Sequence, residues 1–284
     1  MSDSHVEGRR EIGPGRSAYW QAWLPPEQVR GVVVISHGLA EHSGRYAHVG
    51  ARLAAAGFAA YAADHRGHGR TQGSRANLER MALVVDDLGA FVRLATGRHP
   101  GVPVFLLGHS FGGLVALQYA TDPGCPLDGL VLSAPAVEAM VGSALERRLA
   151  GVLSALVPGL PVAALNAEVK ISRDPEVIRA YRDDPLVYRG RIKARTGAEA
   201  LATMQALPTR LPRLSVPLLI LHGTGDLICA LSGSTMVHDT VSSADKTLRH
   251  YPDLYHEIFN EPEQDEVLTD LLTWLEAHLS PQSA

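Results

Sequence analysis

Cysteine is scarce in this sequence, and its scarcity excludes two kinds of protein. The chain has 284 residues but only two cysteines, Cys125 and Cys229. Two isolated thiols cannot form the disulfide framework of a small secreted protein, and they match no zinc-ligand spacing. We therefore expect free thiols in a reducing compartment, and no structural metal.

The sequence also lacks an excess of positive charge. It contains 26 lysine and arginine residues against 30 aspartate and glutamate residues, which gives a formal net charge of −4. A nucleic-acid-binding domain normally carries a basic face. We therefore expect no nucleic-acid partner.

No apolar segment is long and continuous enough to span a membrane. Residues 149–167 carry no charge, but Pro158, Gly159 and Pro161 interrupt them and would break a spanning helix. Residues 1–10 are polar and lack the apolar core of a signal peptide. The sequence thus predicts a cytoplasmic protein in which residues 149–167 form an apolar surface element that makes transient contact with a membrane.

What the sequence does have is a regular alternation of strand-like and helix-like segments. This pattern is typical of a mainly parallel sheet with helices on both faces. An antiparallel edge strand is predicted at residues 19–24. The other predicted strands are residues 31–36, 58–63, 102–107, 127–134, 216–222 and 247–251, and the predicted helices are residues 46–56, 78–96, 114–120 and 263–279.

Residues 135–208 break this alternation. They are helix-like, contain several prolines and show no clear strand, and they far exceed the ~2–6 residues of a usual connection in such folds. We interpret them as a helical cap inserted into an α/β core that is formed by residues 1–134 and 209–284.

Residues 108–112 read Gly-His-Ser-Phe-Gly and lie between a predicted strand and a predicted helix. A Gly-x-Ser-x-Gly motif in this context is the signature of a nucleophile elbow, a sharp turn that exposes the serine hydroxyl. The two glycines lack a Cβ, so strand and helix can approach closely. The motif predicts that Ser110 is a nucleophile; taken alone, it also allows a glycine-rich turn with an incidental serine.

A serine nucleophile needs a general base and a group that orients this base. Catalytic groups in such sheets gather at the carboxyl ends of the strands. Asp226 follows predicted strand 216–222 and His256 follows predicted strand 247–251. His250 lies inside the latter strand, and His238 lies in a helix expected between the two strands. The chain order Ser110, Asp226, His256 is that of the α/β-hydrolase fold.

An oxyanion hole needs two backbone donors close to the nucleophile. One candidate is the amide of Phe111, which follows the nucleophile directly. The other is the amide of Leu39, on the loop after predicted strand 31–36, where Gly38 would allow a close approach.

Several segments resemble the monoacylglycerol lipase branch of the α/β-hydrolases, including its bacterial members. They are residues 37–46, 64–70, 108–113, 172–186 and 255–262, and the likeness extends over residues 15–279 with the cap included. The resemblance implies hydrolysis of the ester between glycerol and a single fatty acid, without a cofactor. It implies the same catalytic and oxyanion residues, Ser110, Asp226, His256, Leu39 and Phe111. It also implies an apolar cap that contacts lipid surfaces.

Two residues depart from the family pattern. Phe111 stands where methionine is usual, and Ala40 stands where glycine is frequent. Because both contribute backbone atoms, we expect an altered pocket shape and unchanged chemistry. Cys229 stands where some members also carry a cysteine near the site, and we expect it to be an inert buried thiol.

Glu41, Arg45 and Tyr181 match positions that surround the alcohol end of the substrate in the resembling lipases. Glycerol offers two free hydroxyls, so a site that selects it needs polar partners in an apolar pocket. Alternatively, Glu41 and Arg45 form an ion pair that braces the loop, since they lie four residues apart, and Tyr181 packs in the cap.

Asp64, His65 and His68 lie within five residues of one another, but no further ligands converge on them in the sequence. We interpret this segment as a hydrogen-bonded turn and expect no metal.

Three other functions need consideration. A lysophospholipase or a general carboxylesterase would use the same residues on a different substrate. Haloalkane dehalogenases and epoxide hydrolases share the fold but need a carboxylate where Ser110 stands. A non-catalytic binding protein of this fold would have no need to keep all three catalytic groups.

Overall fold

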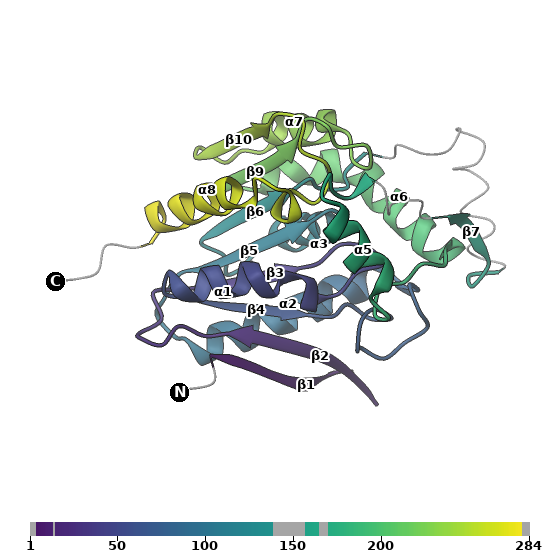
Figure 1. The fold of residues 1–284 in the computed structure, drawn as a ribbon, viewed down its shortest axis with the longest axis horizontal. Helices are drawn as coiled ribbons and strands as arrows, with labels where there is room; N and C mark the ends of the chain where they lie inside the picture. Colours follow the sequence, from purple (N-terminus) through teal and green to yellow (C-terminus); the bar gives the residue numbers. More distant parts are fainter. Residues whose placement is uncertain (1–3, 14, 139–156, 165–169, 280–284) are drawn as a thin grey trace.

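The computed structural model describes residues 4–13, 15–138, 157–164 and 170–279, in which an eight-stranded sheet lies between layers of helices (Figure 1). The strand order is β1-β2-β4-β3-β5-β6-β9-β10. The strands are β1 (His5–Gly13), β2 (Arg16–Trp23), β3 (Gly31–Ser36), β4 (Phe58–Ala63), β5 (Val104–His109), β6 (Gly129–Ser133), β9 (Leu218–Gly223) and β10 (Lys246–Tyr251). From β4 to β10 neighbouring strands are parallel, whereas β2 is antiparallel to both β1 and β4.

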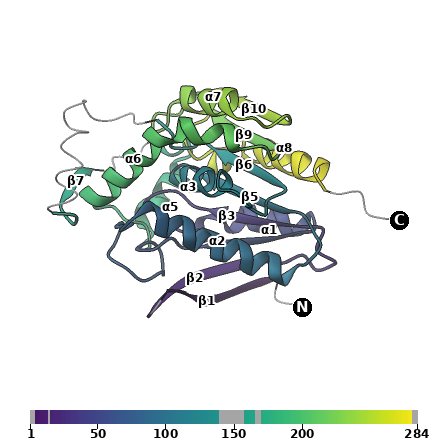
Figure 2. The same cartoon turned by 180° about the vertical axis from the view of Figure 1, so that it is seen from behind.

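Helices cover both faces of this sheet, as the alternation of elements predicts. On one face lie α2 (Met81–Arg98), α3 (Phe111–Ala120), α6 (Ala194–Arg210) and α7 (Leu231–Thr240), and Figure 2 shows α2, α3 and α6 in front of the sheet. On the other face lie α1 (Ala47–Ala55) and α8 (Gln264–Ala277) (Figure 1). In β3, Val32 and Val34 pack into the first layer, and Val33 and Ile35 pack into the second. Successive side chains of a strand point to opposite faces, so a doubly covered strand must be apolar throughout.

The prediction of a mainly parallel, doubly covered sheet is confirmed, and each strand predicted for it forms within a few residues of the expected bounds. Residues 19–24 belong to an antiparallel strand, but the prediction that it forms the edge is wrong, because β1 lies outside it. No sequence pattern predicts β1. Charged residues and glycines make up most of this strand, and only Val6 and Ile12 are large and apolar, so the regular apolar alternation of a half-buried strand is missing.

The predicted cap region contains more strand than expected. β7 (Pro161–Ala164) pairs with β8 (Arg191–Lys193) in an antiparallel ribbon, so the expectation of no strand is wrong. Strands of three and four residues are too short to give a periodic signal. Between them lies α5 (Pro175–Asp183), where Asp174 caps the helix by accepting a hydrogen bond from the Glu176 amide. Of the uncharged segment 149–167, only residues 157–164 are among those described.

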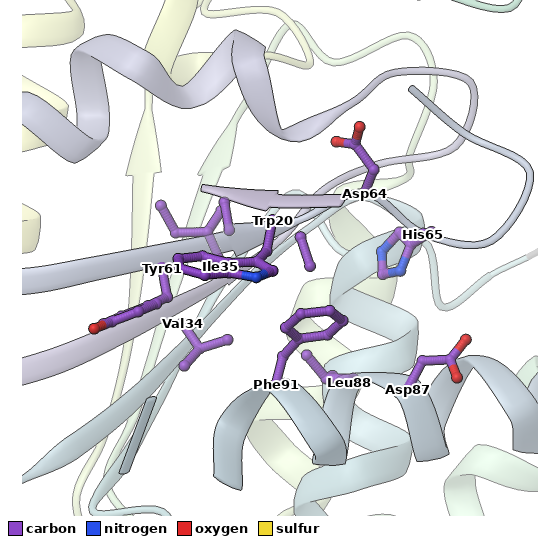
Figure 3. Close-up of a pocket in the computed structure, with 11 residues that line it drawn as sticks. Trp20, Val34, Ile35, Tyr61, Asp64, His65, Asp87, Leu88 and Phe91 are labelled. Carbon is purple, nitrogen blue, oxygen red and sulfur yellow. The ribbon is translucent and has the colours of Figure 1, made fainter. Parts of the chain in front are cut away.

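A small cavity of about 20 Å³ lies between α2 and the sheet (Figure 3). Figure 3 shows Asp87, Leu88 and Phe91 of α2 on one side, and residues such as Trp20 and Tyr61 of the sheet on the other. None of Ser110, Asp226 and His256 is among the residues that line it. The cavity is therefore a gap in core packing, separate from the candidate catalytic residues. No helix in the described ranges is both long and apolar enough to cross a membrane.

The turn between β5 and α3 is the most constrained part of the backbone. Ser110 has φ 53° and ψ −121°, a region that residues with a side chain rarely adopt. Its amide donates to the Ser133 carbonyl at 2.9 Å, which ties the turn to β6. Gly112 lies so close to β3 that a Cβ there would be 2.0 Å from the Ser36 carbonyl oxygen. The sharp turn thus requires glycine at this position.

We expect Gly112→Ala to destabilise the protein by about 1–3 kcal/mol and to impair its activity, because the added methyl must displace the end of β3. Gly97→Ala is the matched control: Gly97 is exposed near the end of α2, and a Cβ there meets no atom within 4 Å. It should stabilise the protein by about 0.5–1 kcal/mol, because alanine favours the helix. Urea unfolding measures both changes. Equal effects of the two substitutions would contradict the tight contact at Gly112.

Candidate active site

Asp226 and His256 are brought together by two packed loops at the carboxyl ends of β9 and β10. Their backbones touch: a Cβ on Gly223 would lie 2.2 Å from the Leu254 carbonyl oxygen. His256 Nδ1 lies 2.7 Å from Asp226 Oδ2, and both side chains are at least 95% buried, with exposures of 5% and 1%. Because a carboxylate only accepts, the Nδ1 proton of His256 donates to it, which leaves Nε2 with a free lone pair.

The Asp226 carboxylate accepts further hydrogen bonds. Its Oδ1 accepts from the amides of Ile228 at 2.7 Å and Cys229 at 2.9 Å. Its Oδ2 also lies 3.3 Å from Nε2 of His222. Burial alone would raise the pKa of Asp226, but the two imidazoles and the Cys229 amide outweigh burial and lower it. Asp226 is therefore held as a carboxylate.

Ser110 lies at the N-terminus of α3, half-buried, beside His109, whose ring centroid is 4.7 Å from that of His256. Within the described part of the chain its hydroxyl makes no hydrogen bond to His256, whose Nδ1 is bonded to Asp226. Catalytic hydrogen bonds are often long or misaligned before substrate binds. The elbow and the Asp226–His256 pair thus share one site, but the Ser110–His256 contact is not formed.

Burial and the nearby charge of Asp226 raise the pKa of the Cys229 thiol, although the Ser110 hydrogen bond opposes them. A thiol held in its protonated form is a poor nucleophile. The inert role expected for Cys229 is therefore supported.

The two candidate oxyanion donors lie on neighbouring segments of the fold. Among the residues that the structure describes, neither the Leu39 amide nor the Phe111 amide donates to another protein group. The loop that carries Leu39 passes directly over the nucleophile, since a Cβ on Gly38 would lie 3.3 Å from Ser110 Cβ. Ala40 has φ 72°, which explains why a glycine suits this position.

Buried imidazoles fix the start of this loop. His37 accepts a hydrogen bond from the His65 amide through Nε2 at 2.9 Å and donates through Nδ1 to the Gly38 carbonyl at 2.7 Å. His65 Nε2 lies 3.1 Å from the His37 carbonyl oxygen. Burial lowers the pKa of all three histidines here, to about 3 for His65, about 4 for His68 and well below its usual value for His37. They are neutral structural groups at physiological pH.

Arg45 lies at the centre of a buried ionic network. It pairs with both oxygens of Glu257, at 2.5 and 2.7 Å, and with Glu41 at 2.9 Å. Its guanidinium also lies 4.8 Å from the ring centroid of Tyr181, in α5. Burial would raise the pKa of Glu257, but the Arg45 charge outweighs burial and lowers it to about 2. Arg45 thus joins the oxyanion loop, the His256 loop and the cap.

Glu41 has its acceptors occupied by the protein. Its Oε1 accepts from the Gly38 amide at 2.6 Å and the Tyr46 hydroxyl at 2.7 Å, and Oε2 accepts from Arg45. These contacts support the bracing role. Contact of Glu41, Arg45 and Tyr181 with glycerol stays a prediction.

Sequence reasoning missed two residues of this site, His222 and Glu257. Neither belongs to a catalytic motif, and each meets its partner only after folding. The only local signal was position, since Glu257 follows His256 directly and His222 lies near the end of a predicted strand.

The remaining histidines and acidic residues have other environments. His250 is exposed on β10, and His238 pairs with its neighbour Asp239 on α7. Asp64 accepts hydrogen bonds from Ser43 and from the Arg70 amide, so residues 64–70 form the hydrogen-bonded turn that we expected. Within the described ranges, no group of three or more potential ligands is arranged to hold a metal ion.

Known proteins share both the sequence and the fold. The family model described as serine aminopeptidase, S33, matches residues 27–263. A monoacylglycerol lipase of Mycolicibacterium smegmatis is 44% identical over 269 residues, which cover 94% of this chain and 95% of the relative. A human monoglyceride lipase is 33% identical, with 87% of this chain and 82% of the relative covered.

A solved structure extends this likeness to three dimensions. The monoacylglycerol lipase of Paleococcus ferrophilus superposes with a TM-score of 0.83 and is 33% identical, over 92% of this chain and 99% of that chain. The chain belongs to the monoacylglycerol lipase family of the α/β-hydrolases.

Proposed function

We propose that this protein is a serine hydrolase that cleaves monoacylglycerols into a fatty acid and glycerol. The observation that carries the proposal is the buried Asp226–His256 pair, with an Nδ1–Oδ2 distance of 2.7 Å, beside the strained Ser110 elbow. This arrangement prepares a base next to a serine, as acyl transfer requires. The monoacylglycerol lipases among its relatives favour this substrate class.

In the proposed reaction, His256 Nε2 takes the proton of Ser110 as Oγ attacks the ester carbonyl. Asp226 orients the imidazole and stabilises the imidazolium that forms. The Leu39 and Phe111 amides bind the developing oxyanion. His256 then protonates the glycerol oxygen as it leaves, and a water molecule attacks the acyl-enzyme by the same route to release the fatty acid.

A lysophospholipase or a general carboxylesterase would use the same chemistry on another alcohol. These two alternatives differ from the proposed function only in the alcohol part of the ester that the site accepts. A panel of monoacylglycerols of graded chain length, lysophospholipids and di- and triacylglycerols, compared by kcat/KM, separates these functions. The proposed function requires the highest value for a monoacylglycerol.

We further propose that the cap makes contact with lipid surfaces. Val157 and Leu160 are exposed by 49% and 37%. Both belong to the uncharged segment 149–167, and both come just before β7. Arg191 and Lys193 of β8 are neighbours in the β7–β8 ribbon. Exposed apolar side chains next to basic residues suit a lipid–water interface.

The nucleophile is tested by substitution. Ser110→Ala should abolish labelling by a fluorophosphonate probe and lower hydrolysis roughly 10⁴–10⁶-fold, because the attacking oxygen is lost. His256→Ala should be nearly as damaging, and the double variant little worse, because the groups act as a unit. His250→Ala, on exposed β10, is the control and should keep its turnover. Substantial hydrolysis by purified Ser110→Ala would refute the assignment.

The role of Glu41 is tested with two substrates. If Glu41 braces the oxyanion loop, Glu41→Gln should lower kcat/KM roughly tenfold for a monoacylglycerol and for the matched methyl ester alike, because a charge-assisted hydrogen bond is lost. Tyr181→Phe serves as the comparison in the cap. If either variant lowers the ratio of kcat/KM for the monoacylglycerol to kcat/KM for the methyl ester, the substituted side chain contacts the glycerol hydroxyls directly.

Lipid contact by the cap is tested with the double variant Val157→Ser, Leu160→Ser. Each substitution removes apolar area that would enter the lipid, so turnover of long-chain substrate presented on vesicles should fall roughly tenfold. Turnover of a water-soluble short ester should be unchanged. Val6→Ser, an exposed apolar residue on the edge strand β1, is the matched control. A loss of the same size on both substrates would mean that these residues serve stability only.

A further inference from the structure

His222 is a completely buried histidine that the catalytic scheme above does not use. It lies in β9, next to the glycine that ends the strand, and its side chain is 0% exposed. Its Nδ1 lies 2.7 Å from the hydroxyl of Ser234, which is also fully buried in α7. Its Nε2 lies 3.3 Å from Asp226 Oδ2 and 3.2 Å from the Cys229 carbonyl oxygen. Both ends of the ring are therefore in polar contact.

These contacts determine which nitrogen carries the proton. Both neighbours of Nε2, a carboxylate and a carbonyl, can only accept hydrogen bonds. Nε2 must therefore be the protonated nitrogen; it donates to the Cys229 carbonyl and lies 3.3 Å from Asp226 Oδ2. In the neutral ring Nδ1 is then an acceptor, and the Ser234 hydroxyl donates to it. The ring is thus held in one tautomer, the reverse of the Nδ1-protonated tautomer of His256.

The result is a carboxylate held between two imidazoles. On Oδ1, Asp226 accepts from two backbone amides; on Oδ2 it accepts from His256, and His222 Nε2 lies 3.3 Å from the same oxygen. The amides alone leave the position of Oδ2 less restricted, since both act on the other oxygen. The Nε2–H group of His222 is a second polar contact of Oδ2, and it restricts the position of this oxygen relative to the His256 Nδ1–H group. It also stabilises the negative charge on Asp226, which weakens the hold of Asp226 on a proton of His256.

We propose that His222 is a positioning residue for the catalytic acid: through Nε2–H it orients Asp226 and moderates the strength with which Asp226 holds the His256 imidazolium. The inference rests on the proposed serine hydrolase chemistry. His222 touches neither substrate nor the reacting atoms and acts only through Asp226. Ser234 supports it by holding Nδ1 free of a proton.

Other charged groups also face this pair and must be kept constant in any test. His256 is faced by Asp226, by His109 and by Glu257, which carries its own partner Arg45. Asp226 is faced by His256 and His222. Variants at His222 leave each of these groups in place, so a change in the pH profile of the variants reports on the His222 contact.

The test compares His222→Asn with His222→Gln. The amide of asparagine reaches only the position of Nδ1, whereas that of glutamine reaches the position of Nε2 and can donate to Asp226. His222→Asn should lower kcat/KM on a water-soluble short ester roughly 10–100-fold, the effect of losing one hydrogen bond to a charge. The acid limb of its pH profile of kcat/KM should move to higher pH, because the Asp226 carboxylate then stabilises protonated His256 more strongly. His222→Gln should keep kcat/KM within roughly threefold of the wild type. The acid limb of its pH profile should lie at the wild-type position.

Two further variants keep the test decisive. In an Asp226→Asn background, the addition of His222→Asn should cost no further activity, because the carboxylate on which it acts is gone. Ser234→Ala leaves His222 and the catalytic residues in place and removes the donor to Nδ1. It should move the acid limb in the same direction by a smaller amount, which provides a readout even if His222→Asn does not fold.

Equal losses in His222→Asn and His222→Gln with an unmoved acid limb, or full activity of folded His222→Asn, would overturn the proposal. An additive loss in the Asp226→Asn background would do the same. Failure of the proposed function would give a different result, in the wild-type protein itself. In that case wild-type protein would not turn over monoacylglycerol or react with a fluorophosphonate, whereas the His222 proposal is judged from the variants relative to the wild type.

Discussion

Ser110 is held at backbone angles of φ 53° and ψ −121°, and the rest of the site depends on what maintains them. Such a conformation costs on the order of 1–3 kcal/mol and persists only where its surroundings enforce it. Here the Ser110 carbonyl accepts from the amides of Gly113, Leu114 and Ala136, and its own amide donates to β6. Gly112 allows the same turn to press against β3, whose next residues form the oxyanion loop. The strain at one residue thereby brings the nucleophile and the two candidate oxyanion donors to one place.

Paired buried charges then hold the loops around this turn. A buried charge without a partner costs several kcal/mol, so each pair is kept only as a complete unit. Arg45 satisfies Glu41 on the loop that carries Leu39 and Glu257 on the loop that carries His256, and it also lies against Tyr181 of α5. The Glu257 amide donates to the Ile171 carbonyl at 2.7 Å, which adds a backbone link to the cap. Three segments far apart in the sequence therefore share one fixed arrangement.

The sequence predicted those parts of the molecule that carry a local pattern. The apolar runs of β3 and β5 and the Gly-x-Ser-x-Gly turn are contiguous, so their structure could be inferred residue by residue. Asp226 and His256 could be placed because each follows a strand, and parallel strands end at the same edge of the sheet. No local pattern marks β1, in which only Val6 and Ile12 are large apolar residues, or the contact of His222 with Asp226. The partner of Arg45 at Glu257 lies 212 residues away, so only the folded chain could reveal it.

The helix α6 determines how the second part of the predicted cap relates to the core. At its start, the hydroxyl of Thr196 donates to the Ala76 carbonyl at 2.8 Å, and the Glu199 carboxylate accepts from the Met81 amide at 2.8 Å. Near its end, Leu207 packs in the core with α3. One continuous helix thus runs from the β8 strand into the sheet layer, across the boundary placed at residue 208. Because residues 170–193 are also hydrogen-bonded to the oxyanion and histidine loops, any outward movement of this part would break core contacts and site contacts together. The position of this part is therefore tied to the two loops that carry the candidate residues Leu39 and His256.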